Sequence, residues 1–498
     1  MNKFGKIVLA FYYAGLGMAI APFSSLAQSG NQSDITGPNP VEIVPNSDTN
    51  NTASESNFLK ADRLAYEAQL QQASNSEAVQ LLEEYQALDF CNHLKLERCG
   101  KVPTPEQIIR VLNQTWQQTG QKAAVIYVSS QQEQIEILTI FPSIANATKQ
   151  SLSDEKIASS IYRVQVPEAS KSLVQETVKN LRRNVTNIRR VSPVYLEPAQ
   201  QLYQWIIAPL EAELRNREID TLVFSMDSGL RLIPISVLHD GEQFLIEKYS
   251  ISIIPSFGLT DTGYFDVRKR QLLAMGATQF VDQNPLPAVE LELEAIAQTS
   301  WQSEIFFNSE FTVENFIQEN RMGQFGIIHL ATHGEFKPGE IENSYIQFTD
   351  RRLNLFELRQ LAKSLGWTDG DRPSIELFVL SACQTAVGDE SAELGFAGLA
   401  IQVGVKSALA SVWRVNDLGT LALMGEYYQQ LAQTPIKVQA LRQAQLKLLK
   451  GETRISEGTL QFSNGSRIPL PPVLQGQTNV NLSHPFFWSS FVAIGNWN

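Results

Sequence analysis

The feature that most constrains the fold is an alternation of apolar runs with helical stretches, which begins near residue 220. Five runs have the length of a strand: DTLVFSM (220–226), LLAMGA (272–277), FGIIHLA (325–331), IELFVLSA (375–382) and SALASVW (407–413). Helical stretches separate most of them, for example at 287–299, 311–320, 354–364 and 395–404. This rhythm predicts βαβ units, and therefore an α/β fold with a mostly parallel sheet flanked by helices.

A smaller α+β domain is predicted upstream, over residues 58–192. Thr104 as N-cap, Pro105 at the first helical position and Gly120 as the stop define one expected helix. The other elements expected here and across the border are a helix at 58–90, a hairpin of 123–130 with 135–141, a strand at 160–166, and helices at 168–183 and 197–216. Two prolines mark the passage between the domains, and we place the boundary near residue 192.

The second domain is predicted to span residues 193–498. After the last strand–helix unit, two helices are expected at 417–432 and 437–450. The polar segment 452–480 is interpreted as a loop or hairpin insertion, and the aromatic sequence SHPFFWSSFVAIGNW (483–497) as a closing strand.

The first 27 residues have the pattern of a secretory signal peptide. Lys3 and Lys6 precede an uncharged apolar run, and Ser25-Leu26-Ala27 places small residues where cleavage occurs. The alternative is an uncleaved anchor. Cleavage would leave no membrane-spanning segment, so the protein is expected to be exported to the periplasm or beyond the cell. Residues 28–57, rich in Ser, Asn, Asp, Thr and Pro, are interpreted as a flexible linker.

Charge and motifs exclude several classes of function. The net charge of −12 argues against general nucleic-acid binding, because that activity relies on basic surface. The sequence contains no phosphate-binding G-x-x-x-x-G-K-[ST] motif, and no cofactor is predicted. His329 lies four residues before His333, but four residues of a strand span about 13 Å, too far to share one metal ion. We therefore predict no metal site.

The chain has three cysteines. Cys91 and Cys99 are close in sequence, and an exported protein can keep a disulfide. The alternative is two unpaired thiols on one helix, because eight helical residues rise about 12 Å, too far for a disulfide. A bridge requires the helix to end near Asn92 or His93. Cys383 is then the odd cysteine, and a candidate reactive thiol.

His333 and Cys383 each follow a strand-like run. In a parallel sheet such strand ends meet at one edge, where ligands bind. An imidazole can take the proton of a thiol and later give it to a leaving amine, which makes the pair a candidate catalytic dyad. The main-chain N–H groups of Gly334 and Cys383 could form an oxyanion hole. The alternative is a cysteine that only packs in the core.

Several motifs, in order, resemble one known family, the CHAT domain. They are LRLIPISVLHDGEQFLIEKYSISIIPS (230–256), IIHLATHGEF (327–336), VLSACQTAVG (379–388), FAGLAIQVGVKSALASVWRVND (396–417) and HPFFWSSFVAIG (484–495). This resemblance, over residues 196–498, implies a caspase–haemoglobinase fold with His333 and Cys383 as the dyad of a cysteine peptidase. Such domains are common in bacteria and often accompany tetratricopeptide repeats, which we do not find upstream here.

The expected function is therefore an exported cysteine endopeptidase that acts on a protein or peptide, with activation by a partner or by another protease. The alternative is a non-catalytic interaction module on the same fold. Asp389 and Glu390 are weak candidates for an acidic substrate pocket, because they could equally lie in a solvated loop. Arg414 and Asp417 could either line the cleft or form a surface pair.

Overall fold

The computed structural model describes residues 63–96, 99–143, 152–188, 193–367, 375–381, 384–385, 390–475 and 480–498. For residues 384, 385, 390 and 391 only the main chain is described. Contacts divide the chain into Met1–Asn46 and Ser47–Asn498, and every described residue belongs to the second unit. The predicted signal peptide (1–27) and linker (28–57) lie outside the described residues.

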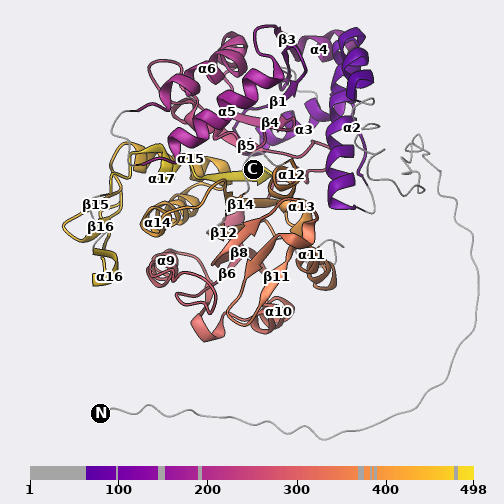
Figure 1. Cartoon of the computed structure of the whole chain (residues 1–498). Helices are drawn as coiled ribbons and strands as arrows, with labels where there is room; N and C mark the ends of the chain where they lie inside the picture. The colour runs from indigo at the N-terminus through magenta and orange to yellow at the C-terminus, as the bar shows by residue number, and fades with distance from the viewer. Residues whose placement is uncertain are drawn as a thin grey trace, which may run out of the picture. The chain divides into compact units, whose positions relative to one another are not determined.

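Among the described residues, eleven strands form one large sheet with the order β3-β2-β1-β4-β5-β18-β14-β12-β8-β6-β7 (Figure 1). Only the pairs β1–β2, β2–β3 and β14–β18 are antiparallel, so the predicted mostly parallel sheet is confirmed. The strands are β1 Ala123–Ser130, β2 Ile135–Ile140, β3 Ile161–Val166, β4 Thr221–Met226, β5 Ser250–Ile253, β6 Gln271–Gly276, β7 Ser303–Phe307, β8 Phe325–Ala331, β12 Leu377–Ser381, β14 Ser407–Ser411 and β18 Phe491–Gly495.

Helices flank this sheet. Figure 1 shows α9 and α14 on one side of strands β6, β8 and β12, and α11 and α13 on the other. The helices are α2 Asn75–Leu94, α3 Pro105–Thr119, α4 Asp154–Ser159, α5 Lys171–Val185, α6 Leu196–Ile206, α7 Glu211–Asn216, α8 Leu245–Lys248, α9 Val289–Ala297, α10 Val313–Met322, α11 Leu355–Ser364, α12 Glu390–Ala397, α13 Leu399–Val403, α14 Asp417–Gln433, α15 Lys437–Leu449, α16 Pro472–Gln475 and α17 Pro485–Trp488. A further helical stretch covers residues 63–72.

Local sequence explains several helix ends. Thr104 accepts a hydrogen bond from Gln107 N, Pro105 opens α3, and Gly120 ends it with a φ of 74°. This is the predicted start and stop. The single helix predicted at 197–216 is wrong: α6 ends at Ile206, a 3₁₀ turn covers Ala208–Leu210, and α7 follows. Pro209 in that turn has no N–H to continue the helical ladder.

The boundary predicted near residue 192 does not divide the sheet. Strand β1 pairs in parallel with β4, with Ala123 opposite Thr221 and Val128 opposite Met226, and β2 and β3 extend the same sheet outward. Contacts outside the sheet also cross this boundary. Arg63 binds Asp227 in a two-pronged pair, and buried Arg231 binds Asp89 on α2. The strands of the upstream region therefore form one wing of the large sheet.

Two small sheets lie beside the large one. The first has the order β11-β10-β9-β13, with β9 Gly334–Phe336, β10 Tyr345–Gln347, β11 Arg352–Asn354 and β13 Gln384–Thr385. The second consists of β15 Arg454–Ser456, β16 Thr459–Gln461 and β17 Arg467–Pro469, within the predicted insertion 452–480. Buried Glu426 on α14 anchors this insertion by accepting hydrogen bonds from Thr453 Oγ1 (2.7 Å) and Ser463 Oγ (2.6 Å).

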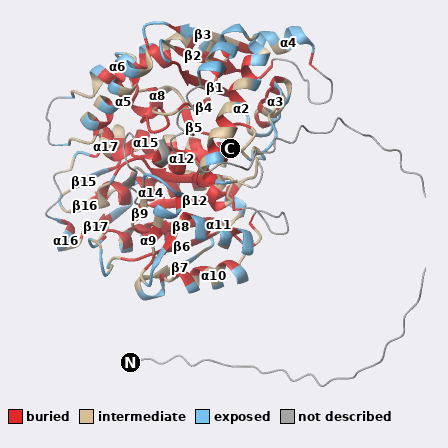
Figure 2. Ribbon diagram, turned by 45° about the vertical axis from the view of Figure 1, so that its right-hand side comes forward, coloured by how far each residue is buried: buried red, intermediate tan, exposed pale blue. Residues whose placement is uncertain are grey.

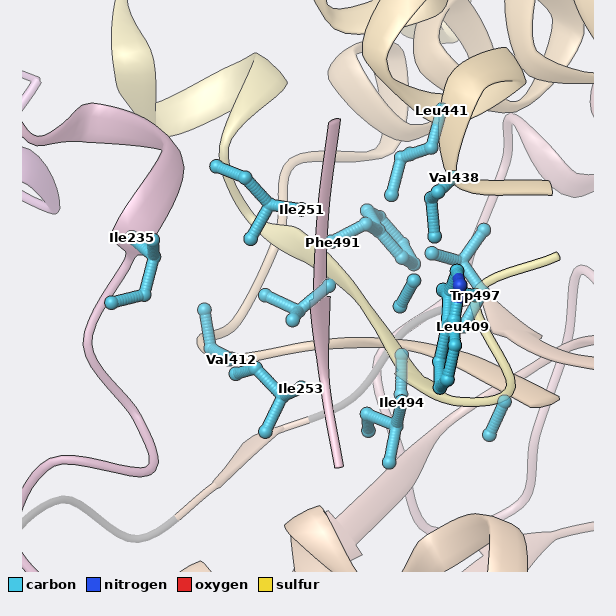
Figure 3. Packing of buried hydrophobic residues seen from close by; sticks show 14 of the residues in the cluster. Ile235, Ile251, Ile253, Leu409, Val412, Val438, Leu441, Phe491, Ile494 and Trp497 are labelled. Atoms are coloured by element: carbon cyan, nitrogen blue, oxygen red, sulfur yellow. The ribbon is translucent and has the colours of Figure 1, made fainter. Parts of the chain in front are cut away.

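The core follows the sheet. Figure 2 shows the strands buried and the outward faces of the helices exposed. Every residue of β4, β8, β12 and β14 is buried, as expected for parallel strands covered on both faces. Figure 3 shows the contacts around β18, where Phe491, Ile494 and Trp497 lie near Ile253 of β5 and Leu409 of β14. None of the described helices is long and apolar enough to span a bilayer.

Helix α2 ends at Leu94, with Lys95 in the left-handed conformation as its C-cap. This turn ends the helix before Cys99, and the Cα atoms of Cys91 and Cys99 are 5.5 Å apart, joined as a disulfide. The end of α2 that carries the disulfide packs against α12. There Phe90 and Leu94 form a small buried cluster with Leu394 and Ala397. The disulfide therefore lies next to a helix that begins seven residues after Cys383.

Candidate active site

Strands β8 and β12 position the two segments that carry the predicted dyad. They are parallel neighbours with Leu377 opposite Ile327 and Ser381 opposite Ala331, so both end at the same edge of the sheet. Past this edge, Thr332 N donates a hydrogen bond to Ser381 O at 3.1 Å. His333 follows β8 by two residues. Cys383 would follow β12 by two residues, but it lies outside the described residues.

A second pairing holds the chain on the far side of both residues. Strand β13 begins at Gln384 and runs parallel to β9, with Gln384 opposite Glu335 and Thr385 opposite Phe336. The main chain is thus paired before the predicted dyad, at Ser381 and Ala331, and again after it, at Gln384 and Glu335. The described flanks of the two predicted dyad positions therefore lie side by side.

The ring of His333 is held by two contacts. Its Nε2 lies 2.8 Å from the main-chain oxygen of Asn284, and its ring meets Phe280 edge-on with centroids 5.0 Å apart. Because a carbonyl oxygen can only accept, Nε2 carries the proton of this hydrogen bond. In the neutral ring Nδ1 then carries the lone pair, which makes it the nitrogen able to accept a proton.

The surroundings keep His333 neutral. Burial is the largest influence and lowers the pKa of His333 below its usual value, and the nearby charge of Arg414 lowers it further. The hydrogen bond to Asn284 acts in the opposite direction but does not outweigh them. A neutral imidazole at physiological pH is the form required of a general base.

His333 opens into a cavity of about 840 Å³. The wall is made by the loop after β6 (residues 281–286), the start of α9, the start of β9, the end of β12 and residues 414–420 at the start of α14. These segments are far apart in sequence but all leave the carboxyl edge of the sheet or begin the helices that follow it. This is where ligands bind in open α/β sheets.

Buried polar groups form the deep end of the cavity. Glu292 on α9 is 2% exposed, and its Oε1 accepts a 2.6 Å hydrogen bond from Ser381 Oγ at the end of β12. Behind it, His329 Nδ1 lies 3.1 Å from the hydroxyl of Tyr428. His329 Nε2 is 3.0 Å from Glu292 Oε1, but this close contact lacks the alignment of a hydrogen bond. His329 is thus a buried strand residue near the site.

Asp417 begins α14 and also lines the cavity. Its pKa is raised to about 6, first because burial disfavours the carboxylate and second because Glu292 is nearby, while Arg414 acts in the opposite direction. A carboxyl group whose pKa is raised by burial and by a neighbouring carboxylate, in a cavity, is a feature of functional sites. Arg414 and Asp417 could either line the cleft or form a surface pair. Both residues line the cleft.

The remaining predicted site residues have different outcomes. Gly334 lines the cavity and begins β9, where it pairs with Ile346, and its oxyanion role stays a prediction. Asp389 lies outside the described residues. Glu390 is the first residue of α12, and its side chain is not described. Within the described ranges, no group of three or more His, Cys, Asp or Glu side chains is arranged to hold a metal ion.

Three contributors to the site were not predicted. Asn284 contributes its main-chain oxygen. Because every residue has such an oxygen, the sequence cannot single out this position. The sequence predicts Ser381 only as part of a strand. Glu292 lies in VELELEAIA, and no local pattern distinguishes it from the exposed Glu290 and Glu294. Only its position near the start of the helix that follows β6, on the ligand-binding edge, could have indicated otherwise.

Comparisons with known proteins identify the family of the chain. No curated protein matches the chain. One similar solved structure is the Arg-specific cysteine proteinase gingipain R, with 10% identity, a TM-score of 0.36, and coverage of 66% of this chain and 74% of that one.

Another is the separase–securin complex of Saccharomyces cerevisiae, with 11% identity, a TM-score of 0.36, and coverage of 84% of this chain but only 33% of that one. The family assignment does not depend on these two structures. The family model of the CHAT domain matches residues 196–496, which is more than half of the sequence and contains both predicted dyad residues. The chain therefore belongs to the CHAT domain family.

Proposed function

We propose that the protein is an exported cysteine endopeptidase in which His333 and Cys383 form the catalytic dyad. The observation that carries this proposal is the tautomer of His333: a fixed hydrogen bond from Nε2 to Asn284 O leaves Nδ1 with its lone pair. The two ladders on either side of the dyad support it, because they hold the flanks of Cys383 beside the flanks of His333. Membership of the CHAT family supports the same reading.

The chemistry follows from these groups. His333 Nδ1 takes the proton of the Cys383 thiol, and the thiolate attacks the carbonyl carbon of the scissile peptide. As the C–N bond breaks, His333 gives the proton to the leaving amine, which leaves an acyl group as a thioester on Cys383. Water then attacks the thioester with His333 again as the base, which releases the acid and restores the thiol. The N–H groups of Gly334 and Cys383 are the proposed donors to the oxyanion.

A non-catalytic interaction module is the alternative reading. It would be favoured if His333 were bound to a buried carboxylate and held away from the cysteine. Among the described residues, the hydrogen bond of His333 goes instead to a main-chain carbonyl that lies on the cavity wall. This arrangement leaves the second ring nitrogen available, which a binding module does not need.

Export is part of the proposal. It is supported by the signal-peptide pattern of residues 1–27 and by the Cys91–Cys99 disulfide, since such bonds persist mainly in oxidising compartments. The N-terminus of the protein purified from its producing cell would test it. We expect the chain to begin at Gln28. We also expect its mass to be about 2 Da below that of the reduced chain, because a disulfide removes two hydrogen atoms. A chain that keeps residues 1–27 would contradict cleavage.

The dyad is tested by covalent labelling of the mature protein with peptidyl electrophiles, read by intact mass. We expect one adduct on the wild type, none on Cys383→Ala, and labelling at least about 100-fold slower on His333→Ala, because a general base contributes about 10²–10⁴-fold. His484→Ala is the matched control, since that histidine caps α17 away from the cavity. No selective adduct, even after limited proteolysis, would favour the interaction module.

The pH dependence of labelling tests the state of His333. Because the pKa of His333 is lowered below 6.5, the base is present at neutral pH and is lost only as the pH falls through that lowered value. We expect the labelling rate to be level between about pH 7 and 8 and to fall below about pH 6. A rate that still rises steeply from pH 6 to 8 would contradict a neutral, poised His333.

A further inference from the structure

The cavity is rich in negatively charged side chains. The described residues that line it include four carboxylates, Asp282, Glu292, Glu335 and Asp417, but only one lysine or arginine, Arg414. Glu335 is already engaged, by Lys337 at 3.3 Å and by the Tyr345 hydroxyl at 3.2 Å. Arg414 is exposed. Among the described residues that line the cavity, no buried lysine or arginine therefore lies beside the carboxylates of Glu292 and Asp417.

Two further atoms at this deep end have unused hydrogen-bonding capacity. Thr420 lies one helical turn from Asp417 and is 6% exposed, and its Oγ1 is buried without a hydrogen-bond partner among the described residues. Glu292 uses Oε1 for Ser381 and for the contact with His329, which leaves Oε2 without a partner in the same set. A buried oxygen without a partner, such as Thr420 Oγ1, is costly, and a ligand that supplied the donor would remove this cost.

This deep end includes Ser381, which precedes the proposed nucleophile Cys383 by two residues in the chain and whose hydroxyl binds Glu292. Two residues of chain reach at most about 7 Å. His333 lines the same cavity. Cys383 would attack the carbonyl of the substrate residue before the scissile bond. The side chain of that residue would then lie nearest to the deep end. A long side chain extending from it would reach the carboxylates.

We propose that Glu292, Asp417 and Thr420 form the pocket for the residue whose carbonyl is attacked, and that this pocket selects the cationic side chain of arginine or lysine. The inference rests on the proposed function and adds a substrate class to it. Several N–H donors on one positive group match two carboxylates and a hydroxyl oxygen, which a neutral side chain cannot do. The weak candidates Asp389 and Glu390 are not needed for this selectivity.

The burial of the two carboxylates agrees with this assignment. The pKa of Asp417, about 6, reflects a charge that is disfavoured by burial and by Glu292. A bound guanidinium or ammonium group would supply the opposite charge and remove both penalties. The binding of a cation is therefore expected to lower the pKa of Asp417, and the cation should bind more tightly at pH 8 than at pH 5.

The test uses peptidyl electrophiles that are identical except for their last residue, which is arginine, lysine, citrulline or leucine. Citrulline has the shape of arginine without its charge. On the wild type we expect labelling with arginine or lysine at least about 100-fold faster than with citrulline or leucine, because buried acceptors left unpaired penalise the neutral ligands. In Glu292→Gln and Asp417→Asn this ratio should fall to below about 10-fold. In Glu290→Gln, an exposed glutamate on the same helix, the ratio should stay at the wild-type value.

The outcomes separate this inference from the proposed function. Fast labelling with leucine or citrulline, and loss of the adduct in Cys383→Ala, would keep the peptidase but overturn the cationic pocket. The absence of any peptidyl adduct, while iodoacetamide still alkylates Cys383, would overturn both. The ratio of rates is used because a change in folding alters all four probes together.

A measurement on the wild type avoids variants that fail to fold. Agmatine carries the guanidinium group of arginine on an alkyl chain, and it should protect Cys383 from iodoacetamide more strongly at pH 8 than at pH 5. A neutral urea analogue of the same length should give no protection. Equal protection by both compounds, or by neither, would overturn the pocket.

Discussion

The two titratable groups best described in the cavity, His333 and Asp417, are both moved by burial toward their neutral forms. For the histidine this means a lowered pKa and for the carboxyl a raised one, to about 6. The consequences differ in kind. A neutral His333 is ready to take a proton. The Asp417 carboxylate is charged above about pH 6, and burying this charge lowers the stability of the folded protein. A residue with a purely structural role would not need such a charge.

The cost of Asp417 can be measured by replacing it. Above about pH 6 it is charged in both the folded and unfolded chains, and the buried charge lowers the free energy of unfolding by up to about 3 kcal/mol. Below about pH 4 it is protonated in both states, and the cost disappears. Asp417→Asn should therefore raise stability at pH 8 and change it little at pH 4. Denaturant unfolding at both pH values would check this, and a variant less stable at pH 8 would contradict it.

Residue identity predicts a candidate dyad but not the groups around it. The spacing and strand-end positions of His333 and Cys383 are visible in the sequence because thiol and imidazole chemistry depends on the side chain. The oxygen that orients His333 belongs to the main chain of Asn284 and has no such signal. Glu292 and Ser381 meet only because α9 and β12 lie together in space, and no local pattern encodes that contact.

At the scale of elements, the short stretch from α12 to α13 contains two glycines in contrasting environments. A Cβ on Gly398 would lie 2.7 Å from Leu94 Cδ1 and 2.9 Å from the main-chain oxygen of Leu394. A Cβ on Gly395, within α12, would find only Phe336 at 3.7 Å, an ordinary contact. Gly398 thus permits the close approach of α2 to α12, while Gly395 does not need to be glycine.

This contrast predicts opposite effects of the same substitution. Gly398→Ala should lower the free energy of unfolding by about 1–3 kcal/mol, because the new methyl group overpacks the contact with α2. Gly395→Ala should be neutral or stabilising by up to about 1 kcal/mol, because alanine is the better helix former. Thermal unfolding of both variants would test this, and a stabilised Gly398→Ala would show that α2 does not rest on this position.

Buried strands were the most predictable elements, since a run of apolar residues between polar turns needs both faces covered. Strands β4, β6 and β8 begin and end within one residue of the expected positions. The failures have local causes. Pro209 interrupts the expected helix 197–216, and Gly398 divides the expected helix 395–404 into α12 and α13. Strand β7 was not predicted, because it is partly exposed and short.

At the scale of the molecule, one strand connects two half-sheets. Strands β3, β2, β1, β4 and β5 form one half, strands β14, β12, β8, β6 and β7 form the other, and β18 lies between β5 and β14. Its side chains Phe491 and Ile494 are buried, as is Trp497 just beyond it. The large sheet continues across the boundary predicted near residue 192, because strand pairing is decided across the whole chain and not by local composition.

Removal of this strand should affect the whole molecule. A chain shortened after His484 would leave β5 and β14 as open edges with their apolar neighbours exposed. We expect it to lose cooperative unfolding and to bind a hydrophobic dye, whereas removal of residues 28–57 should leave a single sharp transition. Cooperative unfolding of the shortened chain, with wild-type stability, would show that the two halves are held together without β18.

The position of β18 near the end of this sequence also affects when the sheet can be completed during synthesis. A ribosome makes residues 491–495 long after both half-sheets have emerged, so the halves cannot join across this strand until then. Residues 414–420 of the cavity wall follow β14, a neighbour of β18, so the proposed peptidase site would be completed late in synthesis. Because we propose that the protein is exported, such a delay would keep the proposed peptidase inactive inside the cell that makes it.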